Sequence, residues 1–139
     1  MSLSLDTTVR LRSGLLMPLF GLGTWLSESG GEASESVLAA IGCGTRLIDT
    51  AAMYENEEDI GKALGEVSGP LPFVVTKLKS DSHGDAGARE GLKASLSKVS
   101  GCGSMDVVAL MTIVRGEDRH TRPKRTHIYR TQQDQDNTH

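Results

Sequence analysis

Apolar and polar residues change their spacing several times along the chain, and each spacing predicts a different kind of element. Residues 7–19 alternate between apolar and polar on both sides of Ser13-Gly14, which predicts two short strands joined by a tight turn. The following apolar run, residues 19–25, contains Gly21 and Gly23, which permit close backbone packing. We expect this run to form a buried strand.

Three segments with helical spacing then alternate with three apolar runs that have the composition of strands. Apolar side chains recur three and four residues apart in the helical segments, and Gly42 and Pro70 lie where the first two should stop. Asn56 is in the position of a helix cap, and the acidic residues after it suit the positive end of the helix dipole. The expected helices cover about residues 33–41, 56–67 and 85–99, and the expected strands cover residues 46–49, 72–77 and 105–111.

The order of these elements is a hairpin followed by strands and helices in alternation. Such alternation predicts parallel strands with helices packed outside them. An open doubly wound sheet and a (β/α)8 barrel both fit this order, so the expected fold class is α/β, with about four parallel strands and an N-terminal β-hairpin. In either architecture, functional side chains gather at the carboxyl ends of the strands.

Three chemically useful side chains, those of Trp25, Asp49 and Lys77, end successive strands, and Tyr54 lies in the loop after the second strand. A phenol is a weak acid near neutral pH, but a neighbouring ammonium favours the phenolate and lowers the pKa of the phenol. A partly buried ammonium keeps its proton when a carboxylate pairs with it. Taken singly, Asp49, Tyr54 and Lys77 fit a turn residue, a packing group and a solvated strand end. Taken together at one edge of a sheet, they predict a unit that delivers a proton.

Composition narrows the classes of function. The chain has 139 residues and a net charge of −3, with 9 Lys and Arg against 14 Asp and Glu in the first 111 residues. The last 28 residues carry 6 basic and 4 acidic side chains. They have no amphipathic period and a single aromatic residue, so a disordered polar tail explains them better than an arm that binds nucleic acid. No apolar run approaches the length of a membrane span, and the start lacks the apolar core of a signal peptide, so we expect a cytoplasmic protein.

Two further sequence features lack the residue pattern of a functional site. Cys43 and Cys102 lack paired spacing, which indicates small buried thiols and neither a disulfide nor a metal site. A dinucleotide-binding fingerprint that begins at Gly21 would need a third glycine at position 26, where Leu26 stands. The chain therefore lacks the glycine pattern of a Rossmann domain.

Three stretches of the sequence resemble the aldo-keto reductases. MPLFGLGTW is similar to the first strand of that family, LIDTAAMYENEEDIGKAL to its second strand and helix, and FVVTKL to its third strand. The motifs stand in the family's order and spacing, and the resemblance covers about residues 8–111. It implies the first half of a TIM barrel with a hairpin at its N-terminal end, and NADP(H) bound without a Rossmann motif. The implied reaction is hydride transfer to the carbonyl carbon of a small aldehyde or ketone.

Roles for single residues follow from this resemblance by position. It implies that Tyr54 is the general acid, that Lys77 makes it a stronger acid, and that Asp49 pairs with Lys77. Two sets of positions match the family's binding residues. The cofactor-binding positions are Gly23, Thr24, Trp25 and Asp49, and the substrate-pocket positions are Trp25 and Tyr54.

The resemblance ends near residue 111. The family's fourth strand ends in a histidine that orients the carbonyl, and Thr112 stands there in this chain. His120 and His127 lie in the basic segment beyond, where histidines are more often solvated than catalytic. We therefore expect two units. Residues 1–111 form the N-terminal half of an aldo-keto reductase barrel, and residues 112–139 form a polar, basic and disordered tail.

Two functions remain open at this point. A barrel of this type needs about 250 residues, so the first is a truncated NADPH-dependent aldo-keto reductase with weak or no activity. The second is a non-catalytic half-barrel that acts by self-association or by binding a partner through open strand edges at residues 19–23 and 107–111. The tail differs in composition from the rest of the chain, which favours the first. In neither case do we expect a nucleic acid, a membrane or a metal ion as a partner.

Overall fold

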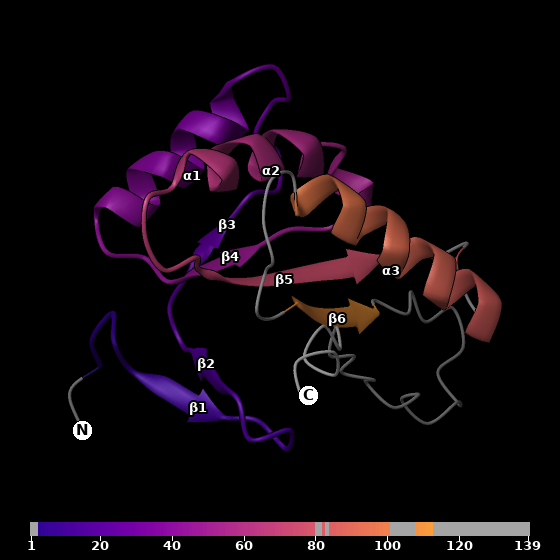
Figure 1. The fold of residues 1–139 in the computed structure, drawn as a ribbon, viewed down its shortest axis with the longest axis horizontal. Coiled ribbons are helices and arrows are strands. Elements are labelled where there is room, and N and C mark those ends of the chain that lie inside the picture. The colour runs from indigo at the N-terminus through magenta and orange to yellow at the C-terminus, as the bar shows by residue number, and fades with distance from the viewer. Residues whose placement is uncertain (1–2, 80–81, 83, 101–107, 113–139) are drawn as a thin grey trace, which may run out of the picture.

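A sheet of parallel strands forms the centre of the molecule. The computed structural model describes residues 3–79, 82 and 84–100 and the backbone of residues 108–112, and in this part of the chain four parallel strands lie in the order β3, β4, β5, β6. The arrows of β5 and β6 point the same way in Figure 1. The predicted parallel order is therefore confirmed. The strands are β3 (Leu22–Gly23), β4 (Leu47–Asp49), β5 (Phe73–Leu78) and β6 (Val108–Thr112).

Three α-helices cover one face of this sheet (Figure 1). They are α1 (Glu32–Gly42), α2 (Glu57–Glu66) and α3 (Asp85–Val99), close to the predicted spans. Burying a Val, Leu or Ile side chain is worth roughly 1.5–3 kcal/mol relative to leaving it exposed, so the spacing of the apolar residues decides which side of each helix meets the sheet. The buried side chains of this layer are Val37, Ile48, Ile60, Ala63, Leu64, Val74 and Val99.

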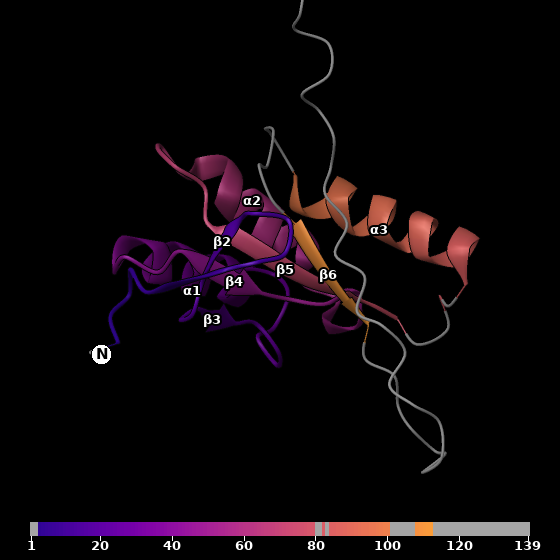
Figure 2. The same ribbon diagram turned by 90° about the horizontal axis from the view of Figure 1, so that it is seen from below.

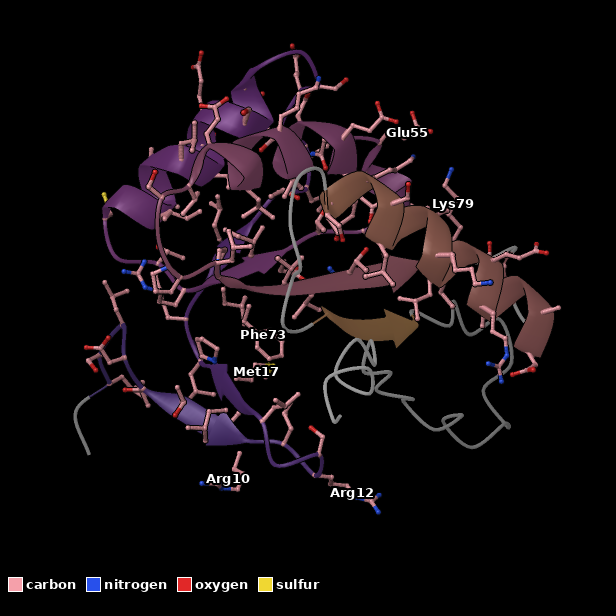
Figure 3. All side chains as sticks on the ribbon, in the orientation of Figure 1. Arg10, Arg12, Met17, Glu55, Phe73 and Lys79 are labelled. Carbon is pink, nitrogen blue, oxygen red and sulfur yellow. The ribbon has the colours of Figure 1, made fainter. Side chains whose placement is uncertain are left out.

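The N-terminal hairpin lies against the opposite face of the sheet. Its strands, β1 (Thr8–Arg10) and β2 (Leu16–Pro18), pair antiparallel, as predicted. Met17 and Phe73 point toward each other between the hairpin and β5 (Figure 3), and Figure 2 shows the hairpin from below, in front of the sheet. Met17 helps to cover Phe73 and Val75. The hairpin thus supplies the second apolar layer that β5 needs to be buried on both sides.

The first strand of the parallel sheet differs from its prediction as a buried strand. It contains two residues, with Leu22 half-buried and Gly23 exposed, because β3 is the edge of the described sheet and has a neighbour on one side only. Gly21 does permit close packing, since a Cβ there would lie 2.6 Å from the carbonyl oxygen of Leu47. Gly23 does not serve this purpose, because no atom lies within 4 Å of a Cβ built on it.

Other expectations either fail or fall on residues outside the described part. Cys43 follows α1 and is exposed, so the prediction of a buried thiol is wrong at this position. β6 runs through Thr112, one residue past the expected boundary, whereas Cys102, His120, His127 and the rest of the predicted tail lie outside the described residues. No helix in the described ranges has both the length and the apolar character that a membrane crossing requires.

Candidate active site

The parallel pairing brings the carboxyl ends of β3, β4 and β5 together. Gly23 pairs with Asp49, and Asp49 pairs with Val75, two residues before Lys77 on β5. A short 3-10 helix, η1 (Ala52–Tyr54), follows β4 and places Tyr54 at the same edge. Figure 3 labels Glu55 and Lys79, the residues that come directly after η1 and β5.

The ammonium of Lys77 is the centre of this group of residues. Its Nζ donates to Asp49 Oδ1 at 2.6 Å, to the carbonyl oxygen of Thr50 at 3.1 Å and to the phenolic oxygen of Tyr54 at 3.2 Å. An ammonium has three N–H donors, so these three acceptors use all of them. The side chain is 8% exposed, a degree of burial that a charge tolerates when it is paired and hydrogen-bonded. The structure thus confirms that Lys77 reaches both Asp49 and Tyr54, while their catalytic roles stay a prediction.

Tyr54 is contacted by Lys77 at its hydroxyl and by Trp25 at its ring. Its oxygen accepts a hydrogen bond from Lys77, whose Nζ lies 5.1 Å from the ring centroid. The indole of Trp25 stacks on the same ring, with centroids 6.4 Å apart and an angle of 27° between the planes. In the described part of the chain the phenolic O–H has no acceptor, so this proton remains available for a carbonyl oxygen placed beside it.

Open space lies over Gly23 at the edge of the sheet that carries Asp49. Gly23 is exposed, and the space where its Cβ would stand is open on the strand that borders Asp49. Asp49 keeps its side chain 38% exposed although Oδ1 is bonded to Lys77. Thr24 is 1% exposed, and both its N–H (3.0 Å) and its hydroxyl (3.3 Å) donate to the carbonyl oxygen of Asp49. This edge fits the nicotinamide end of NADP(H), and the cofactor roles of Gly23, Thr24, Trp25 and Asp49 stay a prediction.

Comparison with known proteins identifies the family. The sequence profile of the Aldo/keto reductase family matches residues 19–113, which is more than half of the chain. The chain belongs to the aldo-keto reductase family. The resemblance inferred from the three sequence motifs is therefore confirmed.

Individual members of the family are similar to this aldo-keto reductase chain over part of their length. It is 42% identical over 101 residues to a glyoxal reductase of Bacillus subtilis (strain 168), which covers 71% of the chain and 37% of that relative. It is 42% identical over 95 residues to the methylglyoxal reductase DkgA of Escherichia coli (strain K12), with 67% and 34% covered. The chain thus spans about a third of the length of these curated relatives.

Solved structures of aldo-keto reductases share the fold. One from Brucella melitensis has a TM-score of 0.67 and 32% identity, covering 81% of this chain and 42% of that protein. One from Bombyx mori, in complex with NADP, has a TM-score of 0.64 and 29% identity, covering 76% and 37%. The expected fold class, a partial (β/α)8 barrel with a hairpin, is confirmed, and the four described strands do not close into a barrel.

Asn56 supports the site of this aldo-keto reductase chain in a way that sequence reasoning missed. It is the residue before α2, as expected of a cap, but its side chain makes no hydrogen bond to the helix, so the predicted capping bond is wrong. Its Nδ2 instead donates to the carbonyl oxygens of Thr24 at 2.8 Å and Ser27 at 3.0 Å. The reason is burial: Asn56 is 1% exposed, and a buried amide must find partners wherever the packing offers them.

Glu57 is a second buried polar residue at the start of α2. The residue is 2% exposed, and its carboxylate accepts hydrogen bonds from Thr76 Oγ1 at 2.6 Å and Ser95 Oγ at 3.1 Å. These hydroxyls and the positive end of the α2 dipole offset the cost of burying the charge. Because Thr76 precedes Lys77, Glu57 ties the site-bearing end of β5 to α2 and α3. The signal in the sequence was Thr76, a polar residue directly after the apolar run Phe73-Val74-Val75 of β5.

Asp59 anchors the loop before α1 to the first turn of α2. Its carboxylate accepts from Lys62 Nζ at 2.9 Å and from the backbone N–H of Gly30 at 2.6 Å. The hydrogen bond from Lys62, followed by that from Gly30, lowers the pKa of Asp59, although burial opposes the shift. The same hydrogen bond raises the pKa of Lys62, whose side chain is 69% exposed.

The lowered pKa of Asp59 predicts a loss of stability in acid. The carboxylate contributes stability that is fully present above the unfolded-state pKa of about 3.9 and is lost as the pH falls through the lower folded-state value. We expect the urea midpoint to fall less steeply below about pH 4 in Asp59→Asn than in the unchanged protein. Urea titrations between neutral and strongly acidic pH measure this difference. A fall in Asp59→Asn as steep as in the unchanged protein would refute the assignment.

Proposed function

We propose that this chain carries the proton-donating part of an NADPH-dependent site that reduces a small aldehyde or ketone to an alcohol. The observation that carries the proposal is the hydrogen-bonded group in which Lys77 Nζ joins the Asp49 carboxylate and the Tyr54 phenol. Relatives named glyoxal reductase and methylglyoxal reductase support small reactive carbonyl compounds as the substrate class.

In this proposal the residues of the chain control one proton. The Tyr54 O–H donates to the carbonyl oxygen of the substrate, and the proton passes to that oxygen as the alcohol forms. The negative charge left on the phenol develops 3.2 Å from the Lys77 ammonium, which stabilises it. Asp49, 2.6 Å from the same ammonium, keeps that cation oriented. NADPH, when bound, supplies the hydride that reaches the carbonyl carbon.

The edge of β3 is the proposed place for the reactive end of the cofactor. Gly23 leaves open space next to Asp49, and Trp25 forms an exposed aromatic wall beside Tyr54. The similar Bombyx mori protein was solved in complex with NADP, which supports NADP(H) as the cofactor. The cytoplasmic location stays an expectation from the sequence.

The purified chain is expected to consume NADPH with methylglyoxal, but far more slowly than the Bacillus subtilis glyoxal reductase assayed beside it. Holding cofactor and carbonyl in a reactive geometry can be worth about 7–11 kcal/mol, and the chain spans 37% of that relative. The measurements are the loss of NADPH absorbance and a separate titration of NADPH binding. Absence of both binding and turnover would contradict the proposal.

One observation supports the alternative function, a non-catalytic half-barrel that acts by self-association or by binding a partner. Leu19 and Phe20, which lead into the edge strand β3, are 54% and 57% exposed, and unpaired edges with apolar neighbours promote association. Self-association through this edge stays a prediction. A chain that binds no NADPH would leave this alternative as the better account.

A further inference from the structure

The loop that carries Trp25 has an unfavourable backbone conformation at the next residue. Leu26 has φ of +66°, in the left-handed region that residues other than glycine, asparagine and aspartate rarely adopt. Leu26 is 80% exposed, so burial of its side chain does not offset the energetic cost of this backbone conformation. Contacts elsewhere must hold this conformation.

The side chain of Asn56 provides such contacts on both sides of the strained residue. Its Nδ2 donates to the carbonyl oxygens of Thr24 and Ser27, the residues that flank Trp25 and Leu26. The Thr24 carbonyl also accepts from the N–H of Ser27 at 3.2 Å, which closes the turn. One buried amide group therefore bridges the two ends of a tight loop.

Asn56 is itself held by Thr50, which also contacts the Lys77 ammonium. The hydroxyl of Thr50 donates to Asn56 Oδ1 at 3.5 Å, and the carbonyl oxygen of the same Thr50 accepts from Lys77 Nζ at 3.1 Å. The residue stands at the start of α2, is 1% exposed, and has both ends of its amide engaged. It thus connects the loop of Trp25 with the residues that hold the Lys77 ammonium.

We propose that Asn56 is a positioning residue that holds the Trp25 loop in its strained conformation and so sets the indole over the ring of Tyr54. Removal of its two N–H donors would let Leu26 relax and the indole leave its 6.4 Å stack. The consequence for carbonyl binding rests on the proposed function. The placement of the indole does not, and it can be measured without turnover.

Trp25 is the single tryptophan of the chain, so its fluorescence reports this loop alone. Asn56→Asp keeps the shape of the side chain but presents a carboxylate to two carbonyl oxygens in place of the N–H donors. We expect Asn56→Asp to lose most of the slowly decaying part of the Trp25 fluorescence anisotropy, with the far-ultraviolet circular dichroism unchanged. Thr50→Val, which removes the hydroxyl at Oδ1 and keeps both Nδ2 bonds, should retain it. Equal anisotropy decays in Asn56→Asp and the unchanged protein would overturn the proposal.

A double-mutant comparison with Leu26→Gly distinguishes a positioning role of Asn56 from a general contribution to stability. Leu26→Gly relieves the strain at φ +66°, so it should raise the urea midpoint more in the unchanged protein than in Asn56→Asp, where the loop has already relaxed. Additive midpoint shifts would overturn the proposal.

The unchanged protein offers a test if Asn56→Asp does not fold. We expect the two side-chain N–H protons of Asn56 to exchange with solvent much more slowly than those of an exposed amide, because they are buried and bonded to Thr24 and Ser27. Rapid exchange of both protons would overturn the proposal.

Where the chain turns over methylglyoxal, Asn56→Asp should raise KM more than it lowers kcat. Absence of both NADPH binding and turnover in the unchanged protein would refute the proposed function and leave the fluorescence test intact.

Discussion

Replacing Tyr54 by phenylalanine is expected to lower the rate of carbonyl reduction by roughly 10²–10⁴-fold, the usual contribution of a positioned general acid. Phenylalanine keeps the ring that stacks on Trp25 but has no O–H to give to the carbonyl oxygen. The Lys77 ammonium retains Asp49 and the Thr50 carbonyl as acceptors, so the surroundings of the ring should keep their arrangement.

The measurement is NADPH consumption at high protein concentration, with kcat and KM determined separately and NADPH binding titrated for each variant. Tyr129→Phe alters the chain's other tyrosine in the same way and should leave the rate unchanged. If Tyr54→Phe turned over as fast as the unchanged protein, another group would have to supply the proton, and the role proposed for Tyr54 would be wrong.

Replacing Gly61 by alanine is expected to lower the free energy of unfolding by roughly 3 kcal/mol, at the upper end of the cost of overpacking a core. A Cβ at this position would lie 3.0 Å from the carbonyl carbon of Lys98, 3.2 Å from Val99 Cα and closer still to the Lys98 carbonyl oxygen. These are backbone atoms, which cannot turn aside as the end of a side chain can. α2 and α3 would have to separate, which would also strain the hydrogen bond between Ser95 and Glu57.

Gly42→Ala is the matched control, because it makes the same change in a helix where no atom lies within 4 Å of the new Cβ. Glycine is intrinsically less favourable than alanine in a helix, so this variant should be as stable as the unchanged protein or slightly more stable. Urea unfolding followed by circular dichroism compares the two. Similar midpoints for Gly61→Ala and Gly42→Ala would show that the helices can separate at little cost.

The order of elements could be predicted from the sequence because periodicity is a local property. Apolar residues three and four apart marked α1, α2 and α3, and compact β-branched runs marked β5 and the neighbouring strands. The burial of β3 could not be predicted in this way. An apolar run has the same composition at the edge of a sheet as in its centre, and the number of neighbouring strands decides how much of it is covered.

The catalytic candidates could also be found from the sequence. Asp49 ends β4 and Lys77 lies one residue before the end of β5, and parallel pairing places such ends at one edge, so their proximity followed from the predicted topology. Tyr54 follows β4 by a few residues and had little freedom to lie elsewhere. The partners of the polar residues at the start of α2 did not follow in this way, because the sequence predicts only a helix cap at Asn56.

By itself the sequence determined the alternation of strands and helices, the hairpin and the residues that gather at the carboxyl ends of the strands, since all of these depend on spacing along the chain. Only the tertiary structure decided which groups satisfy the buried polar side chains. Asn56 reaches Thr24 across 32 residues, and Glu57 reaches Ser95 across 38. A buried amide or carboxylate must be hydrogen-bonded, but its partner is set by how the elements pack and leaves no period in the sequence.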